Sequence, residues 1–94
     1  MLQNYGNDEF FLCRNCPDPF KDKTIIKYYV PHKEKINIEV VDCKTVKIKT
    51  LVNEIKEKGN YQVEFFANGL KEGIYTYTMI AGRFTMARRM LYLK

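Results

Sequence analysis

The sequence predicts an all-β fold, an antiparallel sandwich or small barrel of about seven short strands. Large apolar residues alternate with polar residues over short runs, which is the period of a strand with one buried face. Turn residues separate these runs at short intervals, and only one brief segment resembles a helix. The 94 residues, 14% of them aromatic, suffice for one domain with a small core.

The first part of the chain is expected to be mostly irregular. Residues 1–8 are polar and predict a loose N-terminal segment, and a single domain is expected over residues 9–94. Residues 9–12 are a candidate first strand. The stretch 13–22 predicts a loop, because its two prolines exclude both a helix and a central strand.

The middle of the chain holds the most regular strand patterns. Residues 24–30 are β-branched and aromatic, and Pro31 ends them. Residues 35–41 alternate cleanly, and 46–52 is the expected partner strand. The intervening turn, 42–45, begins with an aspartate whose carboxylate can accept from the backbone two residues further on.

A hairpin is expected in the last third of the chain. Residues 53–58 are short and polar, which favours a helical turn or a loop, and 59–66 predicts another strand. Two β-rich runs then flank Gly82, which can supply the positive φ of a tight turn. The second run, 84–94, is apolar near its end, so we expect a paired strand and not a free tail.

The alternation also predicts the core. Four tyrosines offer a stacking platform for nucleic-acid bases, but their alternation with polar residues favours burial. The residues expected to be buried are Ile36, Ile38, Val40, Val46, Ile48, Tyr61, Val63, Phe65, Tyr75 and Tyr77.

The charge pattern favours solvated strand faces. The formal net charge is +5, but lysines are interleaved with acidic residues along several strands. We therefore expect no nucleic-acid partner. No segment has the length and apolarity of a membrane span, and the N-terminal residues lack the pattern of a secretory signal.

The cysteines raise the question of a metal. Cys13 and Cys16 have the spacing of a metal or redox motif, and Cys43 and His32 are the other ligand candidates. If the strands on either side of His32 form a hairpin, His32 and Cys43 lie at opposite ends of it. A three-thiolate site then remains as the alternative, while free thiols with no metal and no cofactor are favoured.

Catalytic machinery is not expected. One histidine in a turn gives no credible Ser-His-Asp or Cys-His arrangement. The acidic residues show no paired, desolvated carboxylates, and no glycine-rich phosphate loop is present. The sequence therefore predicts a protein that is not an enzyme.

Several motifs follow one another in a recognisable order. They are Phe11-Leu12-x-x-Asn15-x-Pro17-x-Pro19-Phe20, Thr24-x-Ile26-x-Tyr28-x-Val30-Pro31, Ile36-x-Ile38-x-Val40-x-Asp42, Val46-x-x-x-x-Leu51-Val52, Gly59-x-Tyr61-x-Val63, Leu70-x-x-Gly73-Ile74-Tyr75-x-Tyr77, Ala81-Gly82-x-Phe84 and Arg89-Met90-Leu91-Tyr92-Leu93-Lys94. Over about residues 10–94 the chain resembles the type A C-terminal sorting domain of the type IX secretion system. It is more distantly similar to the immunoglobulin-like domain of flagellar hook-capping proteins.

The resemblance implies a seven-stranded immunoglobulin-like β-sandwich that acts as an export tag. In the family, cargo carries this domain, an outer-membrane translocon recognises it, and a sortase-like protease usually removes it. The family usually has a glycine where this chain has Thr45, and an aromatic residue where it has Cys16. The implied partner-recognition residues are Arg89, Met90, Leu91, Tyr92, Leu93 and Lys94.

Two functions follow as hypotheses. The first is a non-catalytic protein-recognition domain of the type IX sorting kind, exported to the periplasm or cell surface. The alternative is a stand-alone accessory subunit whose sandwich holds a larger protein complex together. Because no signal-peptide pattern is present, an intracellular complex stays open, and edge strands offer a route to oligomers.

Overall fold

Seven strands and no helix make up residues 9–94, the part of the chain that the computed structural model describes. The strands are β1 (Phe11–Leu12), β2 (Lys23–Val30), β3 (Glu34–Val41), β4 (Lys47–Lys56), β5 (Gly59–Phe66), β6 (Gly73–Ala81) and β7 (Phe84–Tyr92). The predicted all-β class and strand number are confirmed. The loose segment expected over residues 1–8 lies outside the described residues.

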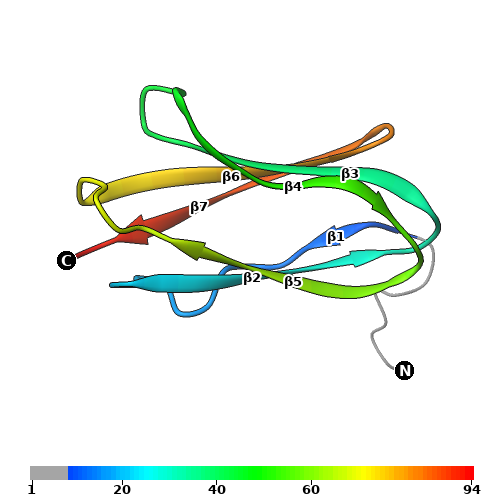
Figure 1. The fold of residues 1–94 in the computed structure, drawn as a ribbon, viewed down its shortest axis with the longest axis horizontal. Helices are drawn as coiled ribbons and strands as arrows, with labels where there is room; N and C mark the ends of the chain where they lie inside the picture. The colour runs from blue at the N-terminus through cyan, green and yellow to red at the C-terminus, as the bar shows by residue number, and fades with distance from the viewer. Residues whose placement is uncertain (1–8) are drawn as a thin grey trace.

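The strands form two antiparallel sheets packed face to face (Figure 1). One sheet has the order β1-β2-β5 and the other the order β4-β3-β6-β7. Consecutive strands β3 and β4, and likewise β6 and β7, pair as hairpins, whereas the chain changes sheet between β2 and β3 and again around β5. This arrangement is an immunoglobulin-like sandwich, as predicted.

The core lies between the two sheets and agrees largely with the alternation in the sequence. Ile48, Tyr61 and Val63 are only partly buried, although they pack against the core. The expected core residues that are buried are Ile36, Ile38, Val40, Phe65, Tyr75 and Tyr77.

The prediction that Val46 is buried is wrong, because its exposed fraction is 56%. β4 begins only at Lys47, and the ladder between β3 and β4 shifts register twice along its length. Each shift breaks the period of two, so a side chain predicted from alternation to face inward leaves the core.

The prediction of a helical turn or loop over residues 53–58 is wrong for residues 53–56, whereas residues 57–58 connect β4 to β5 outside any strand. β4 continues to Lys56, which pairs with Glu34 at the start of β3. This pairing gives the backbone N–H and C=O groups of β3 their hydrogen-bond partners. The gain from those hydrogen bonds outweighs the low strand propensity of a polar segment.

The turn between β3 and β4 follows the predicted aspartate chemistry. Asp42 Oδ1 accepts hydrogen bonds from the backbone N–H groups of Lys44 (2.8 Å) and Val46 (2.9 Å). Thr45, at the position where the family usually has glycine, has a φ of 63°. A β-branched residue is strained in this left-handed region.

Replacing Thr45 by Gly is expected to raise the free energy of unfolding by about 0.5–1 kcal/mol. Relief of left-handed strain outweighs the extra chain entropy that glycine gives the unfolded state. A denaturant titration of both proteins measures the change. Thr85→Gly, within regular strand β7, is the matched control and is expected to lower stability. A lower midpoint for Thr45→Gly would contradict the expectation.

Candidate recognition surface along the C-terminal strand

The sequence-predicted recognition run, residues 89–94, occupies the end of β7 and the two residues after it. β7 pairs with β6 along its whole length, from Phe84 opposite Ala81 to Tyr92 opposite Gly73. Gly82 has a φ of 61° in the turn that joins them. The predicted hairpin and the predicted pairing of the C-terminal strand are both confirmed.

Burial divides the run into two sets of side chains. Met90 and Tyr92 point into the core, and the ring of Tyr92 lies 5.3 Å from that of Phe20. Because these two side chains are buried, only the alternate side chains of the run are accessible to a partner. The exposed or half-exposed members are Arg89, Leu91, Leu93 and Lys94.

The end of the run is held in place by the proline-containing loop. The N–H of Phe20 donates to the carbonyl of Leu91 (3.0 Å), and the N–H of Leu93 donates to the carbonyl of Phe20 (2.9 Å). Asp18 Oδ1 accepts from the N–H of Leu91 (2.9 Å). The loop thus extends the sheet beside Tyr92 in the parallel sense and fixes the backbone of the recognition run.

Within residues 9–94, no strand pairs with the rest of the β7 edge. β7 is the last strand of its sheet within residues 9–94. Because backbone groups on one edge repeat every second residue, Thr85, Ala87 and Arg89 direct their N–H and C=O groups to the same side as Leu91. This free edge is the kind of surface to which an extended segment can add.

Arg88 is a residue that the sequence analysis missed. Its Nε donates to the carbonyl of Leu12 (2.6 Å), and its guanidinium lies 5.8 Å from the ring centroid of Phe11. The side chain therefore connects β7 to β1 in the opposite sheet. The signal was present in the alternation, since Arg88 stands on the same inward face as Met90.

Tyr77, opposite Arg88 in the β6–β7 register, makes a second connection between the sheets. Its hydroxyl donates to the carbonyl of Cys13 (2.7 Å). Burial raises the pKa of Tyr77 to about 12. These contacts hold the strip of chain after β1 against β7 and fix one wall of a groove.

That groove, with a volume of about 390 Å³, lies beside the free edge of β7. Arg14, Arg88 and Arg89 line it together with one acid, Asp18. Three guanidinium groups stand against one carboxylate, so the groove has an excess of positive charge. Electrostatically it suits an anionic ligand.

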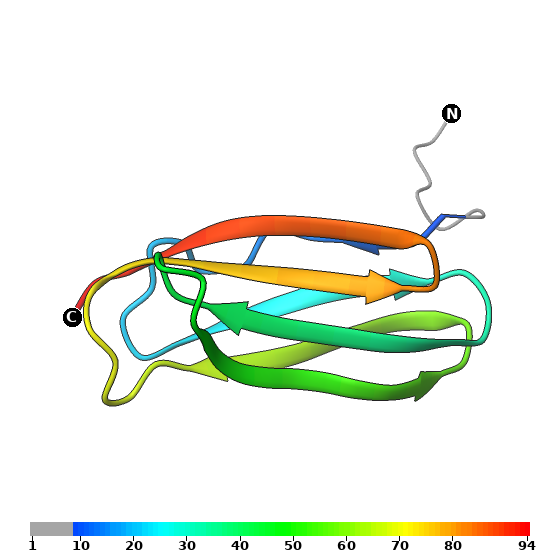
Figure 2. The ribbon, with the colours of Figure 1, turned by 90° about the horizontal axis from the view of Figure 1, so that it is seen from above.

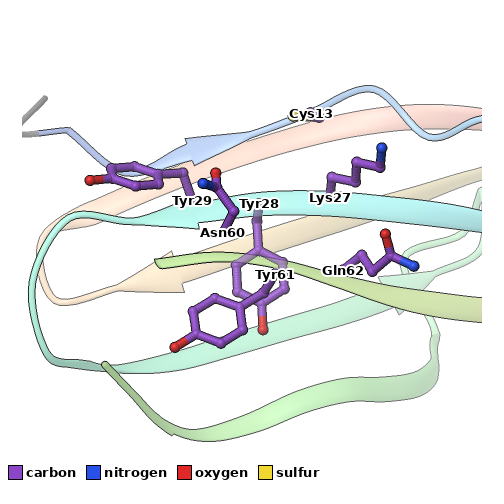
Figure 3. A pocket seen from close by; sticks show the side chains of 7 residues that line it. All are labelled: Cys13, Lys27, Tyr28, Tyr29, Asn60, Tyr61 and Gln62. Carbon is purple, nitrogen blue, oxygen red and sulfur yellow. The ribbon is translucent and has the colours of Figure 1, made fainter. Parts of the chain in front are cut away.

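A second hollow of about 350 Å³ lies beside the β2–β5 pair (Figure 3). Its lining includes Cys13, Lys27, Tyr29, Asn60 and Gln62. It has mixed polar character, and no cluster of charge marks a particular ligand.

Tyr28 and Tyr61, which also line this second hollow, stack with ring centroids 5.5 Å apart. Burial raises the pKa of Tyr28. Tyr61 is partly buried against the core, and its hydroxyl donates to the carbonyl of Glu57. Tyr28, Tyr75 and Tyr77 are buried, so the expectation that the tyrosines pack in the core is confirmed for these three.

The candidate metal ligands are dispersed over the fold. Cys13 follows β1, Cys16 bridges to β2, and Cys43 lies in the β3–β4 turn, all as free thiols. The premise of a hairpin around His32 is wrong, since β2 and β3 lie in different sheets. Among residues 9–94 no three His, Cys, Asp or Glu side chains are grouped to hold a metal ion. The same residues contain no helix that would span a membrane.

Comparison with known proteins gives one match. A family model described as a secretion system C-terminal sorting domain matches residues 16–92. The matched region includes strands β2 to β7 and the recognition run as far as Tyr92. Neither the curated proteins nor the solved structures match the chain.

Proposed function

Since the chain belongs to the family of secretion system C-terminal sorting domains, we propose that it is a sorting signal that type IX secretion machinery reads at its C-terminal strand. The domain would act by protein recognition and not by catalysis. The exposed side chains of the run, Arg89, Leu91, Leu93 and Lys94, are the proposed contacts.

One observation supports this location: the run combines exposed side chains with a fixed backbone. The loop around Phe20 holds Leu91 and Leu93, and the N–H of Lys94 donates to Glu72 Oε2 (2.7 Å). A surface that is already ordered loses little conformational entropy when a partner binds, which favours affinity. No observation favours the alternative of an accessory subunit.

The test replaces Arg89 and Lys94 by Ala together. Both side chains are exposed, and such charges contribute about 0–1 kcal/mol to stability, so the thermal midpoint is expected to stay near that of the parent. Export of a fused reporter by cells with a type IX translocon is expected to fall.

The matched control removes two charges elsewhere on the same sheet, with Lys35→Ala and Lys49→Ala. Both lysines are exposed, and the control is expected to export like the parent. If the Arg89 and Lys94 double variant melts and exports like the parent, the recognition surface lies elsewhere.

A further inference from the structure

We propose that the groove beside β7 binds an extended, acidic peptide segment of a partner protein, which adds as a strand to the free edge of β7. The proposal rests on the proposed function, because it names the kind of partner segment that the sorting domain engages. It adds a second contact surface, which overlaps the start of the recognition run at Arg89 and continues back along β7 toward Thr85.

The chain itself shows that this edge accepts an added segment. Phe20 occupies the edge beside Leu91 and Leu93 and exchanges backbone hydrogen bonds with both. From Arg89 back to Thr85 the edge continues without such a segment in the part of the chain that the structure describes. Figure 2 shows β7, in red, along the margin of its sheet. An incoming strand would continue the row that Phe20 begins.

The side chains beside this edge leave room for another backbone. Thr85 and Ala87 are small, and Ile74 and Leu91 form an apolar margin at the end of the groove. A bound segment would therefore find main-chain partners along the strand and shallow apolar contact beside it. Such backbone pairing supplies affinity without demanding a particular sequence.

The positive charge of the groove favours a negatively charged segment. Arg14, Arg88 and Arg89 face one carboxylate, Asp18, whose Oδ1 is engaged by a backbone N–H. Arg88 is half-buried and anchored by its bond to Leu12, so its charge has a defined position. An extended partner that carries carboxylates can form charge-assisted hydrogen bonds with these guanidinium groups.

The same charges argue against a second copy of this chain as occupant. Pairing two β7 edges would bring two sets of these arginines together, and like charges across an interface are unfavourable. The arginines thus protect the edge from self-association while leaving it open to an acidic segment.

The binding experiment uses nuclear magnetic resonance of the folded domain titrated with a short synthetic peptide of alternating Thr and Glu. The amide signals of Thr85, Ala87 and Arg89 are expected to shift, whereas a peptide of alternating Thr and Lys leaves them in place. Shifts confined to other strands, or none with the acidic peptide, would overturn the proposal.

Two variants separate charge from backbone pairing. Arg14→Glu reverses one charge outside the recognition run and is expected to weaken peptide binding about tenfold. Ala87→Pro removes an N–H from the free edge without removing a bond to β6, and it is expected to abolish the shifts. Thermal melts confirm folding, and Arg14→Glu serves as the test if Ala87→Pro does not fold.

Inorganic polyphosphate is the probe for the competing interpretation. If it binds as well as the acidic peptide, and Ala87→Pro does not weaken the peptide, the groove recognises negative charge alone and the strand proposal is wrong. Strand addition is supported if polyphosphate binds weakly to the parent and equally weakly to Ala87→Pro, while Ala87→Pro loses binding of the acidic peptide.

Export measurements on the same variants distinguish this proposal from the proposed function. If Arg14→Glu and Ala87→Pro bind the peptide like the parent while the Arg89 and Lys94 variant loses export, the groove proposal fails and the sorting function stands. If both groove variants lose the peptide while every variant exports normally, the groove stands as a binding site and the sorting function fails.

Discussion

Replacing Ile38 by Ala is expected to lower the free energy of unfolding by about 2–5 kcal/mol. Ile38 is fully buried in β3, at the centre of the larger sheet, and it pairs in register with Val52 on β4 and Met79 on β6. Truncation to Ala leaves a cavity in the core. Val52 and Met79 are held by strand pairing on both sides and cannot move to fill it. A loss of this size is a large share of the stability of a small domain.

A urea titration measures the effect, and Ile80→Ala is the matched control. Ile80 lies in the same sheet, but its exposed fraction is 46%, so the same truncation removes little buried surface. We expect the control to cost less than about 1 kcal/mol. A change below about 0.5 kcal/mol at Ile38 would mean that this position is not part of the core.

The second large effect is expected at alkaline pH and involves Tyr77. Its pKa is about 12 in the folded protein, above the ordinary value of 10.0. As the pH rises from 10 to 12 the unfolded chain releases this proton before the folded protein does. The contribution of Tyr77 to the free energy of unfolding is therefore fully present below pH 10, and roughly 2 kcal/mol of it is lost as the pH approaches 12.

Tyr77→Phe isolates this contribution. The variant cannot ionise at this position, so its stability is expected to fall less steeply between pH 10 and 12 than that of the parent. At neutral pH it is expected to be less stable by about 1–2 kcal/mol, since the carbonyl of Cys13 loses its donor. Burial also raises the pKa of Tyr28 and Tyr75, and both remain in the variant.

Denaturant titrations at neutral pH and across the alkaline range measure both effects. Tyr61→Phe is the control, because the hydroxyl of Tyr61 donates to the exposed carbonyl of Glu57. The control is expected to keep the alkaline fall of the parent. Parallel pH profiles for the parent and Tyr77→Phe would show that Tyr77 ionises alike in the folded and unfolded states.

The structure gives the two arginines near the end of β7 different roles. Arg88 faces inward and bonds to Leu12, so its replacement is expected to disturb the contact between the sheets. Arg89, one residue later, is exposed and free to contact a partner. Adjacent residues of a strand point to opposite faces, so Arg88 packs against β1 while Arg89 stays exposed for the proposed recognition.

The amino-acid sequence by itself determined the fold class and most of the strand positions. Period-two alternation marked strands such as residues 35–41, Gly82 marked the last hairpin, and Asp42 marked the turn before β4. The order of these motifs also identified the family. These features are predictable because alternation and turn chemistry depend on residues that are close together in the chain.

Only the tertiary structure decided which side chains of the recognition run are exposed and which residues line the groove beside β7. The register shifts of the β3–β4 ladder expose Val46, and pairing with β3 extends β4 through residues 53–56. The docking of Phe20 on β7 and the bond from Arg88 to Leu12 join residues more than seventy positions apart. Such contacts depend on register and on sheet packing, which no local pattern records, and so the groove beside β7 emerged only once the two sheets were in place.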